Sequence, residues 1–224
     1  MRDFLSPILT LAWKDILLEL RTKEIIASML VFAVLAVIIF NFAFDPTPAV
    51  LALVVPGILW VAFTFSGILG FNRSFILEKD KGSLDGLLLC PISRDVIYLG
   101  KLAGTFLFML AMEALLFPIF AVLYNVSLWI PGLFLVTALA TLGFATVGTL
   151  FSAMAVNTRS REIMLPLLLL PVIVPVIIAA VEATAALLGG ATLADLGRWW
   201  TLLLSFDVIF LVISSFLFGA VLEE

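Results

Sequence analysis

The chain is organised around one stretch, Asn72–Lys101, which reads NRSFILEKDKGSLDGLLLCPISRDVIYLGK. It is the longest part of the chain that is not mainly apolar. Five of the twelve basic residues fall within these thirty positions. Long apolar segments lie on both sides of it, so we predict a polar loop between two membrane spans.

A short helix with a leucine face is predicted inside this loop. Leu84, Leu87 and Leu88 recur at i, i+3 and i+4, which is the spacing of one helix face. Gly82 before the helix and Pro91 after it limit its length to about two turns. The apolar face either rests on the membrane surface or docks into a soluble partner protein. We favour docking and keep the membrane surface as the alternative.

The composition indicates an integral membrane protein. Hydrophobic residues make up 64% of the 224 residues, charged residues only 12%, and the mean hydropathy is +1.28. A soluble domain of this size needs far more charge to cover its surface. The single cysteine, Cys90, excludes an internal disulfide and a thiolate metal site. Because the chain has no histidine, it cannot ligate a metal or a haem through histidine on its own.

Residues 1–24 are predicted to form an amphipathic helix that lies along the membrane. Ser6 and Pro7 have the pattern of a helix start. Apolar side chains then follow a helical spacing on one face and polar side chains occupy the other. The apolar residues are Leu9, Trp13, Ile16 and Leu20, and the polar ones are Asp15, Glu19 and Thr22.

The rest of the chain is predicted to be a single all-α membrane domain with six transmembrane helices. About twenty residues are needed to cross the hydrocarbon core of a bilayer as a helix, and six apolar segments reach that length. They are residues 25–44, 49–71, 96–124, 131–156, 163–188 and 201–222. Residues 72–95 form the coupling loop between the second and third spans.

Prolines and caps predict some local features of these helices. Pro56-Gly57 is expected to kink the second span. Ser93 is expected to cap the third helix, with Asp95 in its first turn. Three prolines are expected to bend or break the fifth span: Pro166, Pro171 and Pro175. Near the start of the third helix, two glycines form a small-xxx-small pair, Gly100 and Gly104.

The basic residues predict the orientation in the membrane. Eleven of the twelve lie in the N-terminal segment, in the stretch 72–101 and in the loop 157–162. Only Arg198 lies on the other side. By the positive-inside rule, both termini and the coupling loop are cytoplasmic, so the chain is N-in and C-in.

Three carboxylates fall within or at the ends of spans and are candidate functional residues. Glu113 lies near the middle of the third span, where an isolated charge is costly, so it is expected to face the bundle interior, a cavity or a partner subunit. Glu182 and Asp207 belong to the outer half of the fifth and sixth spans. For these two, a functional role and simple contact with interfacial water remain alternatives.

The sequence carries no pattern of an enzyme active site. It lacks the glycine-rich phosphate loop G-x-x-x-x-G-K-[ST], a Ser/His pair and a cluster of metal ligands. A helical bundle with a leucine-faced cytoplasmic helix therefore suggests a transport or coupling subunit whose energy comes from another protein.

Two sets of residues resemble known permeases. The coupling loop carries Glu78, Gly82, Ser83, Leu84, Asp85, Gly86, Leu87, Leu88, Leu89, Pro91, Ile92, Ser93, Arg94 and the run Ile97–Lys101. This pattern is similar to the signature between spans two and three of type-2 ABC transporter permeases. Pro56–Val61, PGILWV, leading through Asn72–Phe75 into the loop, more narrowly resembles the B subunit of the cytochrome c maturation haem exporter. The N-terminal charged pattern, the six spans and the length extend this resemblance to the whole chain.

The chain departs from the family pattern at three positions of the loop. Ser83 and Asp85 stand where threonine and glutamate are usual. Cys90 stands where a small residue such as serine is common. These exchanges are conservative for a docking helix.

The resemblance implies a bacterial inner-membrane permease that pairs with a cytoplasmic ABC ATPase subunit. Docking would involve Glu78, Gly82, Ser83, Leu84, Asp85, Gly86, Leu87, Leu88, Leu89, Pro91 and Arg94. The family's complex also contains a haem-handling membrane subunit and a small single-span subunit, and its ATPase activity is linked to release of a haem-loaded periplasmic chaperone. ATP and haem would be bound by these partners, so no cofactor, metal or nucleic acid is expected on this chain.

Two other functions remain open. A type-2 permease for a lipid, a polysaccharide or a drug would share the docking loop but not the cytochrome c assembly partners. A membrane scaffold without an ATPase would retain no nucleotide-binding subunit. Trp199-Trp200 lacks the flanking pattern of a tryptophan-rich haem motif and indicates an aromatic belt at the outer interface.

Overall fold

The computed structural model describes residues 2–44, 48–80, 86–87, 89, 92–156, 158 and 161–221. In these ranges the chain forms long α-helices and one short 3-10 helix, η1, and contains no strand. The long helices are α1 (Arg2–Thr22), α2 (Glu24–Ala43), α3 (Pro48–Asp80), α5 (Arg94–Tyr124), α6 (Pro131–Val156), α7 (Arg161–Leu188) and α8 (Gly197–Val221), and η1 is Leu193–Leu196.

Six of these helices are long and apolar enough to cross a membrane, which confirms the predicted all-α, six-span fold. They are α2, α3, α5, α6, α7 and α8, the last together with η1. In α3 the apolar part is Leu53–Arg73, and the helix continues beyond it to Asp80. Helix α1 is not among the six.

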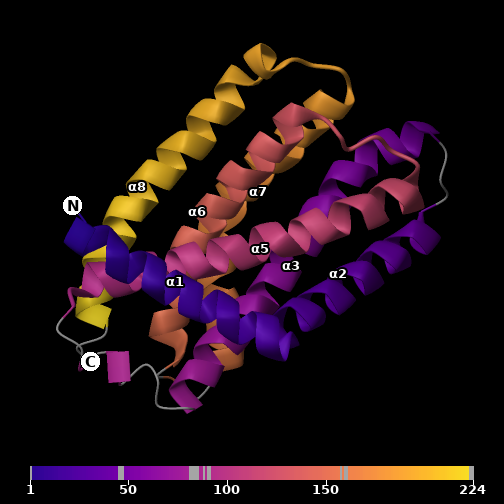
Figure 1. The fold of residues 1–224 in the computed structure, drawn as a ribbon. Coiled ribbons are helices and arrows are strands. Elements are labelled where there is room, and N and C mark those ends of the chain that lie inside the picture. The colour runs from indigo at the N-terminus through magenta and orange to yellow at the C-terminus, as the bar shows by residue number, and fades with distance from the viewer. Residues whose placement is uncertain are drawn as a thin grey trace.

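Helix α6 lies at the centre of the bundle and packs against α3, α5, α7 and α8 (Figure 1). Small residues allow this close packing. A Cβ atom added at Gly148 would lie 2.3 Å from the ring of Phe71 on α3, and one added at Gly143 would lie 3.1 Å from the ring of Phe206 on α8. Helix α2 packs on α3 and α5 at the edge of the bundle.

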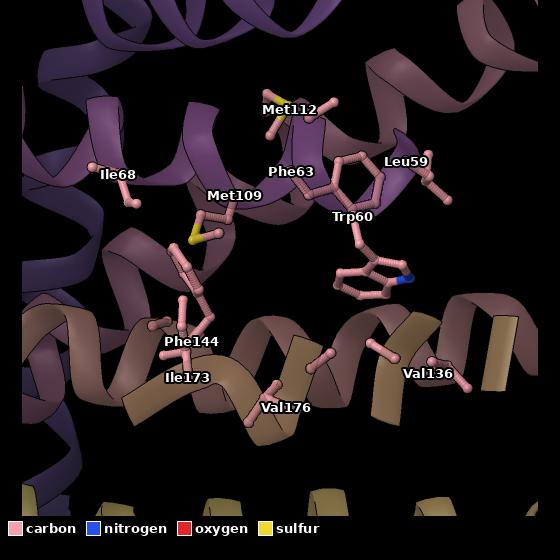
Figure 2. Close-up of a cluster of buried hydrophobic side chains, with 14 of the residues drawn as sticks. Leu59, Trp60, Phe63, Ile68, Met109, Met112, Val136, Phe144, Ile173 and Val176 are labelled. Atoms are coloured by element: carbon pink, nitrogen blue, oxygen red, sulfur yellow. The ribbon is translucent and has the colours of Figure 1, made fainter. Parts of the chain in front are cut away.

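The hydrophobic core lies between α3, α5, α6 and α7, and aromatic side chains of α3 are prominent in it (Figure 2). Phe63 makes edge contacts with Trp60 and with Phe117 of α5. Phe71 packs against Phe144 of α6, with ring centroids 5.6 Å apart. This core sets α3, α5 and α6 around the most buried carboxylate of the bundle.

Helix α1 crosses the first part of α5 (Figure 1). It begins at Arg2, before the predicted start, so Pro7 lies inside the helix. Part of the face predicted to be polar turns toward the protein: Glu19 is 2% exposed and Asp15 is half-buried, while Thr22 is exposed. Leu11 and Ala12 are buried as well. The predicted apolar residues Leu9, Trp13 and Leu20 are exposed on the opposite face, where contact with a membrane surface remains a prediction.

Several predicted boundaries differ from the structure. The loop expected at 72–95 is shorter, because α3 continues to Asp80 and α5 begins at Arg94. Ser93 is the N-cap residue of α5, but its side chain makes no capping hydrogen bond. The prolines do not break the spans, because α3 passes through Pro56 and α7 is one helix through its three prolines. The kink at Pro56-Gly57 and a bend of the fifth span stay predictions. Membrane helices tolerate proline because neighbouring helices and side chains satisfy the freed backbone groups.

The helix ends sort into two sides of the bundle. The start of α1, the end of α8 and the start of α5 lie at one end, and the ends of α5 and α7 lie at the other (Figure 1). The assignment of the first end to the cytoplasm remains a prediction from the basic residues.

Candidate functional site

The predicted docking helix is described only in part. Gly86 and Leu87 are helical, Leu87 is half-buried, and Leu89 is 88% exposed. Glu78 lies near the end of α3, and nothing is described of its side chain. The remaining predicted docking residues lie outside the described ranges: Gly82, Ser83, Leu84, Asp85, Leu88 and Pro91. A docking role for this segment therefore stays a prediction.

Arg94 ties the segment that follows the docking loop to the end of α8. Its Nη1 donates a hydrogen bond to the backbone carbonyl of Gly219, at 2.8 Å. The last carbonyl groups of a helix have no partner within the helix, and a cation there also interacts favourably with the helix dipole. The contact joins the start of α5 to the last turn of α8.

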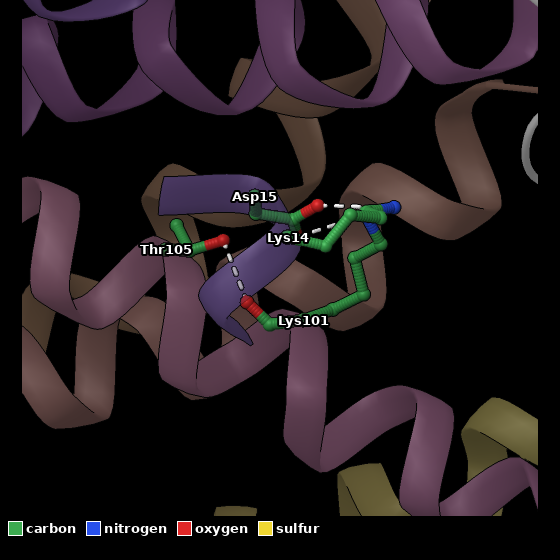
Figure 3. A network of polar contacts seen from close by, with 4 residues as sticks. All are labelled: Lys14, Asp15, Lys101 and Thr105. Carbon is green, nitrogen blue, oxygen red and sulfur yellow. Dashed lines mark hydrogen bonds and ion pairs between the residues drawn. The ribbon is translucent and has the colours of Figure 1, made fainter. Parts of the chain in front are cut away.

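A second polar contact ties α5 to α1 (Figure 3). Lys101 Nζ lies 3.0 Å from Asp15 Oδ2, and the lysine side chain is only 2% exposed. Lys14 Nζ lies 3.1 Å from the other oxygen, Oδ1, but its side chain is 41% exposed. The approach of the two helices depends on Gly100, where an added Cβ would lie 2.7 Å from the Cβ of Leu11. The predicted glycine pair therefore faces α1.

Glu113 is buried in the middle of the bundle, with 1% of its surface exposed. The Oγ1 hydroxyl of Thr141 on α6 donates a hydrogen bond to Oε1 at 2.7 Å. Around the carboxyl group lies a pocket between α3, α5, α6 and α7, lined among others by Trp60, Phe63, Thr64, Met109, Phe144 and Val176. Figure 2 shows Trp60, Phe63, Met109, Phe144 and Val176 gathered in this part of the core.

The other two candidate carboxylates lie elsewhere. Asp207 on α8 is 6% exposed, and an added Cβ at Gly143 of α6 would lie 2.6 Å from its Oδ1. Within the described residues neither of its carboxylate oxygens has a hydrogen-bond partner. Its burial argues against simple contact with interfacial water. Glu182 is exposed. Glu113, Glu182 and Asp207 therefore do not form one site.

Three partners in these contacts were missed from the sequence. The sequence pattern predicts Asp15 on the polar, outward face of the N-terminal helix, and it predicts no role in the bundle for Lys101 or Thr141. A lysine inside a membrane span either pairs with an acid or extends to the membrane surface. This is the one signal that could have drawn attention to Lys101. Threonine is common in membrane helices, so nothing in the sequence singles out Thr141.

The described residues include no group of three His, Cys, Asp or Glu side chains that could hold a metal ion. Trp200 donates from Nε1 to the carbonyl of Leu193 at 3.1 Å, and Arg198 lies over the ring of Trp199 at 5.0 Å. Both tryptophans therefore interact with residues that are close to them in sequence.

The bundle of six apolar helices, with α6 at its centre, defines a multi-pass α-helical membrane protein. The family model of the CcmB protein matches residues 6–224, so the chain belongs to the CcmB family.

Curated relatives agree with this assignment. The chain is 31% identical to Heme exporter protein B of Haemophilus influenzae over 169 residues, which cover 75% of this chain and 76% of the relative. It is 29% identical to the Rhodobacter capsulatus protein of the same name over 81% of this chain and 89% of the relative. The Bradyrhizobium diazoefficiens protein of the same name is 28% identical over 94% of this chain and 95% of the relative.

Proposed function

We propose that this chain is the permease subunit of an ABC-type haem-export complex in the bacterial inner membrane. The observation that carries the proposal is the similarity to proteins named Heme exporter protein B along most of the chain. Six membrane helices suit a permease. In this proposal the chain itself is not catalytic, and ATP is hydrolysed by a partner subunit.

The docking loop is the proposed contact with the cytoplasmic ATPase. It is bounded by two long helices that both reach into the membrane domain, α3 and α5. Leu89 is 88% exposed, as an apolar side chain that a partner covers would be. Glu78 and Arg94 flank the leucine-faced helix, and we assign them to the same contact.

The start of α5 is the proposed route from this contact into the membrane. Arg94 binds the end of α8, and Lys101 binds Asp15 on α1. A displacement of the loop would therefore pull on three helices together. Its proposed outcome is the delivery of haem to a periplasmic chaperone and the release of the loaded chaperone.

Haem itself is proposed to be held by a haem-handling membrane subunit, with a small single-span subunit completing the complex. The chain has no histidine, so histidine ligands must come from the partners. Of the three intramembrane candidates, Glu113 and Asp207 are the buried ones, and we propose that transport is sensitive to both.

The test is retention of the ATPase by the membrane subunit. Replacing Leu87 and Leu88 with aspartate places two charges in an apolar docking cleft. We expect the ATPase to be lost from purified membranes while the chain still inserts. Leu193→Asp serves as the control. Leu193 is 43% exposed, so the chain should tolerate the charge. Because it lies at the opposite end of the bundle, the ATPase should stay bound. Normal retention in the double variant would refute docking through this helix.

Identification of the proteins that co-purify in mild detergent tests the cargo. Cytochrome c assembly factors are expected beside the ATPase. An ATPase without them would indicate a type-2 exporter for another substrate, and no ATPase at all would indicate a scaffold.

A further inference from the structure

The carboxyl group of Glu113 has one satisfied oxygen and one that no group of the described chain satisfies. Oε1 accepts the hydrogen bond from Thr141. Oε2 is fully buried and has no hydrogen-bond partner. The pocket that the carboxyl group lines has room for about one water molecule. A buried polar atom without a partner is rare in proteins and points to a bound water or ligand.

The walls of this pocket offer no positive charge among the described residues. Helix α3 contributes Trp60, Phe63 and Thr64, and α7 contributes Val176 and Ile177. The indole N–H of Trp60 is already used, since it donates to Thr184 Oγ1 at 3.0 Å. Among the described residues, Thr141 is the one side chain that hydrogen-bonds to the carboxyl group. An ionised carboxylate in such surroundings would keep one oxygen unsolvated and its charge unpaired, which is very costly.

The hydrogen bond between Thr141 and Oε1 is compatible with a neutral acid whose proton lies on the other oxygen. With the hydroxyl as the donor, Oε1 is the carbonyl acceptor of a neutral carboxylic acid. The proton then sits on Oε2, which turns this atom from an unsatisfied acceptor into a donor. A water molecule in the pocket would accept that hydrogen bond.

We propose that Glu113, with Thr141 and the adjoining pocket, forms a proton- and water-binding site inside the membrane domain. In this site Oε1 accepts from Thr141 and Oε2–H donates to a water molecule. The acid exchanges its proton with that water, so that Oε2–H and D2O give Oε2–D and HOD. The site does not depend on the proposed haem export and would exist in the chain whatever the complex carries.

Asp207 provides an internal comparison. It is also buried and unpaired in the described chain, but it is packed against Gly143, and no hydroxyl donates to it. Of these two carboxyl groups, only that of Glu113 has a side-chain neighbour whose removal should change its spectrum in a defined way.

Infrared spectroscopy of the full-length chain in lipid nanodiscs tests the site. The background is Asp207→Asn/Glu19→Gln, so that the other two buried carboxyl groups of the described residues do not contribute. We expect a carbonyl-stretch band of a protonated carboxylic acid that disappears in Glu113→Gln and persists in Glu182→Gln, the exposed control. In D2O the band should shift to lower frequency, because water reaches the acid.

Thr141→Val keeps the acid and removes its one donor. The band should then move to higher frequency without losing intensity, because a carbonyl that accepts no hydrogen bond is stiffer. This variant decides the matter even if Glu113→Gln does not insert. The site is refuted if no such band exists, if the band is unchanged in Thr141→Val, or if it does not respond to D2O.

Discussion

Lys101 on α5 and Asp15 on α1 form an ion pair in which Nζ lies 3.0 Å from Oδ2. The exposed fractions of the two side chains are 2% and 11%. The pair fixes the N-terminal helix to the beginning of the span that follows the docking loop. A charge buried to this degree is stable only with its partner in place.

The two lysines beside Asp15 should therefore differ in their effect on stability. Lys101→Met removes the buried partner and is expected to cost about 2 kcal/mol of unfolding free energy, below the full cost of an unpaired buried charge because Lys14 remains nearby. Lys14→Met removes an exposed partner and should cost less than about 1 kcal/mol. Thermal unfolding of both variants in the same detergent measures the difference.

The double variant Lys101→Met/Asp15→Leu separates the pair from general packing. It leaves no unpaired buried charge, since Lys14 is 41% exposed, so it should recover much of the stability that Lys101→Met loses. Equal losses for the two lysine variants, or no recovery in the double variant, would show that the buried pair does not hold α1.

A second prediction concerns the glycines of the central helix. Gly148 on α6 faces the ring of Phe71, which is fully buried and packed against Phe144 and so cannot swing away. Gly148→Ala should lower stability by about 1–3 kcal/mol through overpacking. Gly57→Ala on α3 is the matched control, because nothing lies within 4 Å of the added methyl group. It should be neutral or stabilising by up to about 1 kcal/mol, from helix propensity alone. Similar unfolding midpoints for both variants would contradict this packing.

The six spans could be predicted because hydropathy and length are properties of the local sequence. The face of α1 that meets the protein could not. Leu9, Trp13 and Leu20 do follow a helical spacing, but that spacing only says that they share a face. Which face packs on α5 depends on Gly100 and on the pairing of Asp15 with Lys101. Gly100 and Lys101 both lie far from α1 in sequence.

The same distinction applies to the intramembrane carboxylates. Glu113 stands out in the sequence because an acid in the middle of a span needs a buried partner. Its partner Thr141 lies on another helix and has no distinguishing pattern. The extension of α3 to Asp80 was missed for a different reason. The polar composition of the residues after Arg73 marks the end of the membrane span but not the end of the helix.

A pH dependence is expected from Glu19 at the corner between α1 and α2. Its Oε1 accepts a hydrogen bond from the backbone N–H of Ile26 at 2.8 Å, in the first turn of α2. Burial raises the pKa of Glu19 above its ordinary value of 4.5, and the backbone N–H groups of Ile26 and Ile25 offset part of this effect. Between 4.5 and the raised pKa the folded chain binds more protons than the unfolded chain. Stability should therefore fall as the pH rises through that window.

Glu19→Gln removes the titrating group and keeps an acceptor for Ile26. The fall in stability over the window should flatten in this variant. Glu182→Gln, at an exposed position on α7, is the control and should leave the slope of the wild-type chain unchanged. Unfolding midpoints measured over a pH series give both slopes, and the same slope for wild type and Glu19→Gln would contradict the assignment.

The last prediction is that this chain supplies no ligand to haem iron. It contains no histidine, and its one cysteine, Cys90, is predicted to lie on the cytoplasmic side. Both tyrosines donate hydrogen bonds from their buried hydroxyl groups to backbone carbonyls, Tyr98 to Thr146 and Tyr124 to Val37. Methionine as a haem ligand normally accompanies histidine.

Three methionines within the spans are the remaining candidate ligands. Met109 and Met112 are buried in the core, while Met154 is 40% exposed. The purified chain mixed with haem should therefore show no sharp low-spin Soret band, whereas the complex with its partners should bind haem in a defined state. A stoichiometric low-spin spectrum of the chain alone that is abolished by Met154→Leu, or by replacing Met109, Met112 or a tyrosine, would overturn the prediction. Iron ligation would then lie within this bundle, and direct passage of haem through it would become the favoured mechanism.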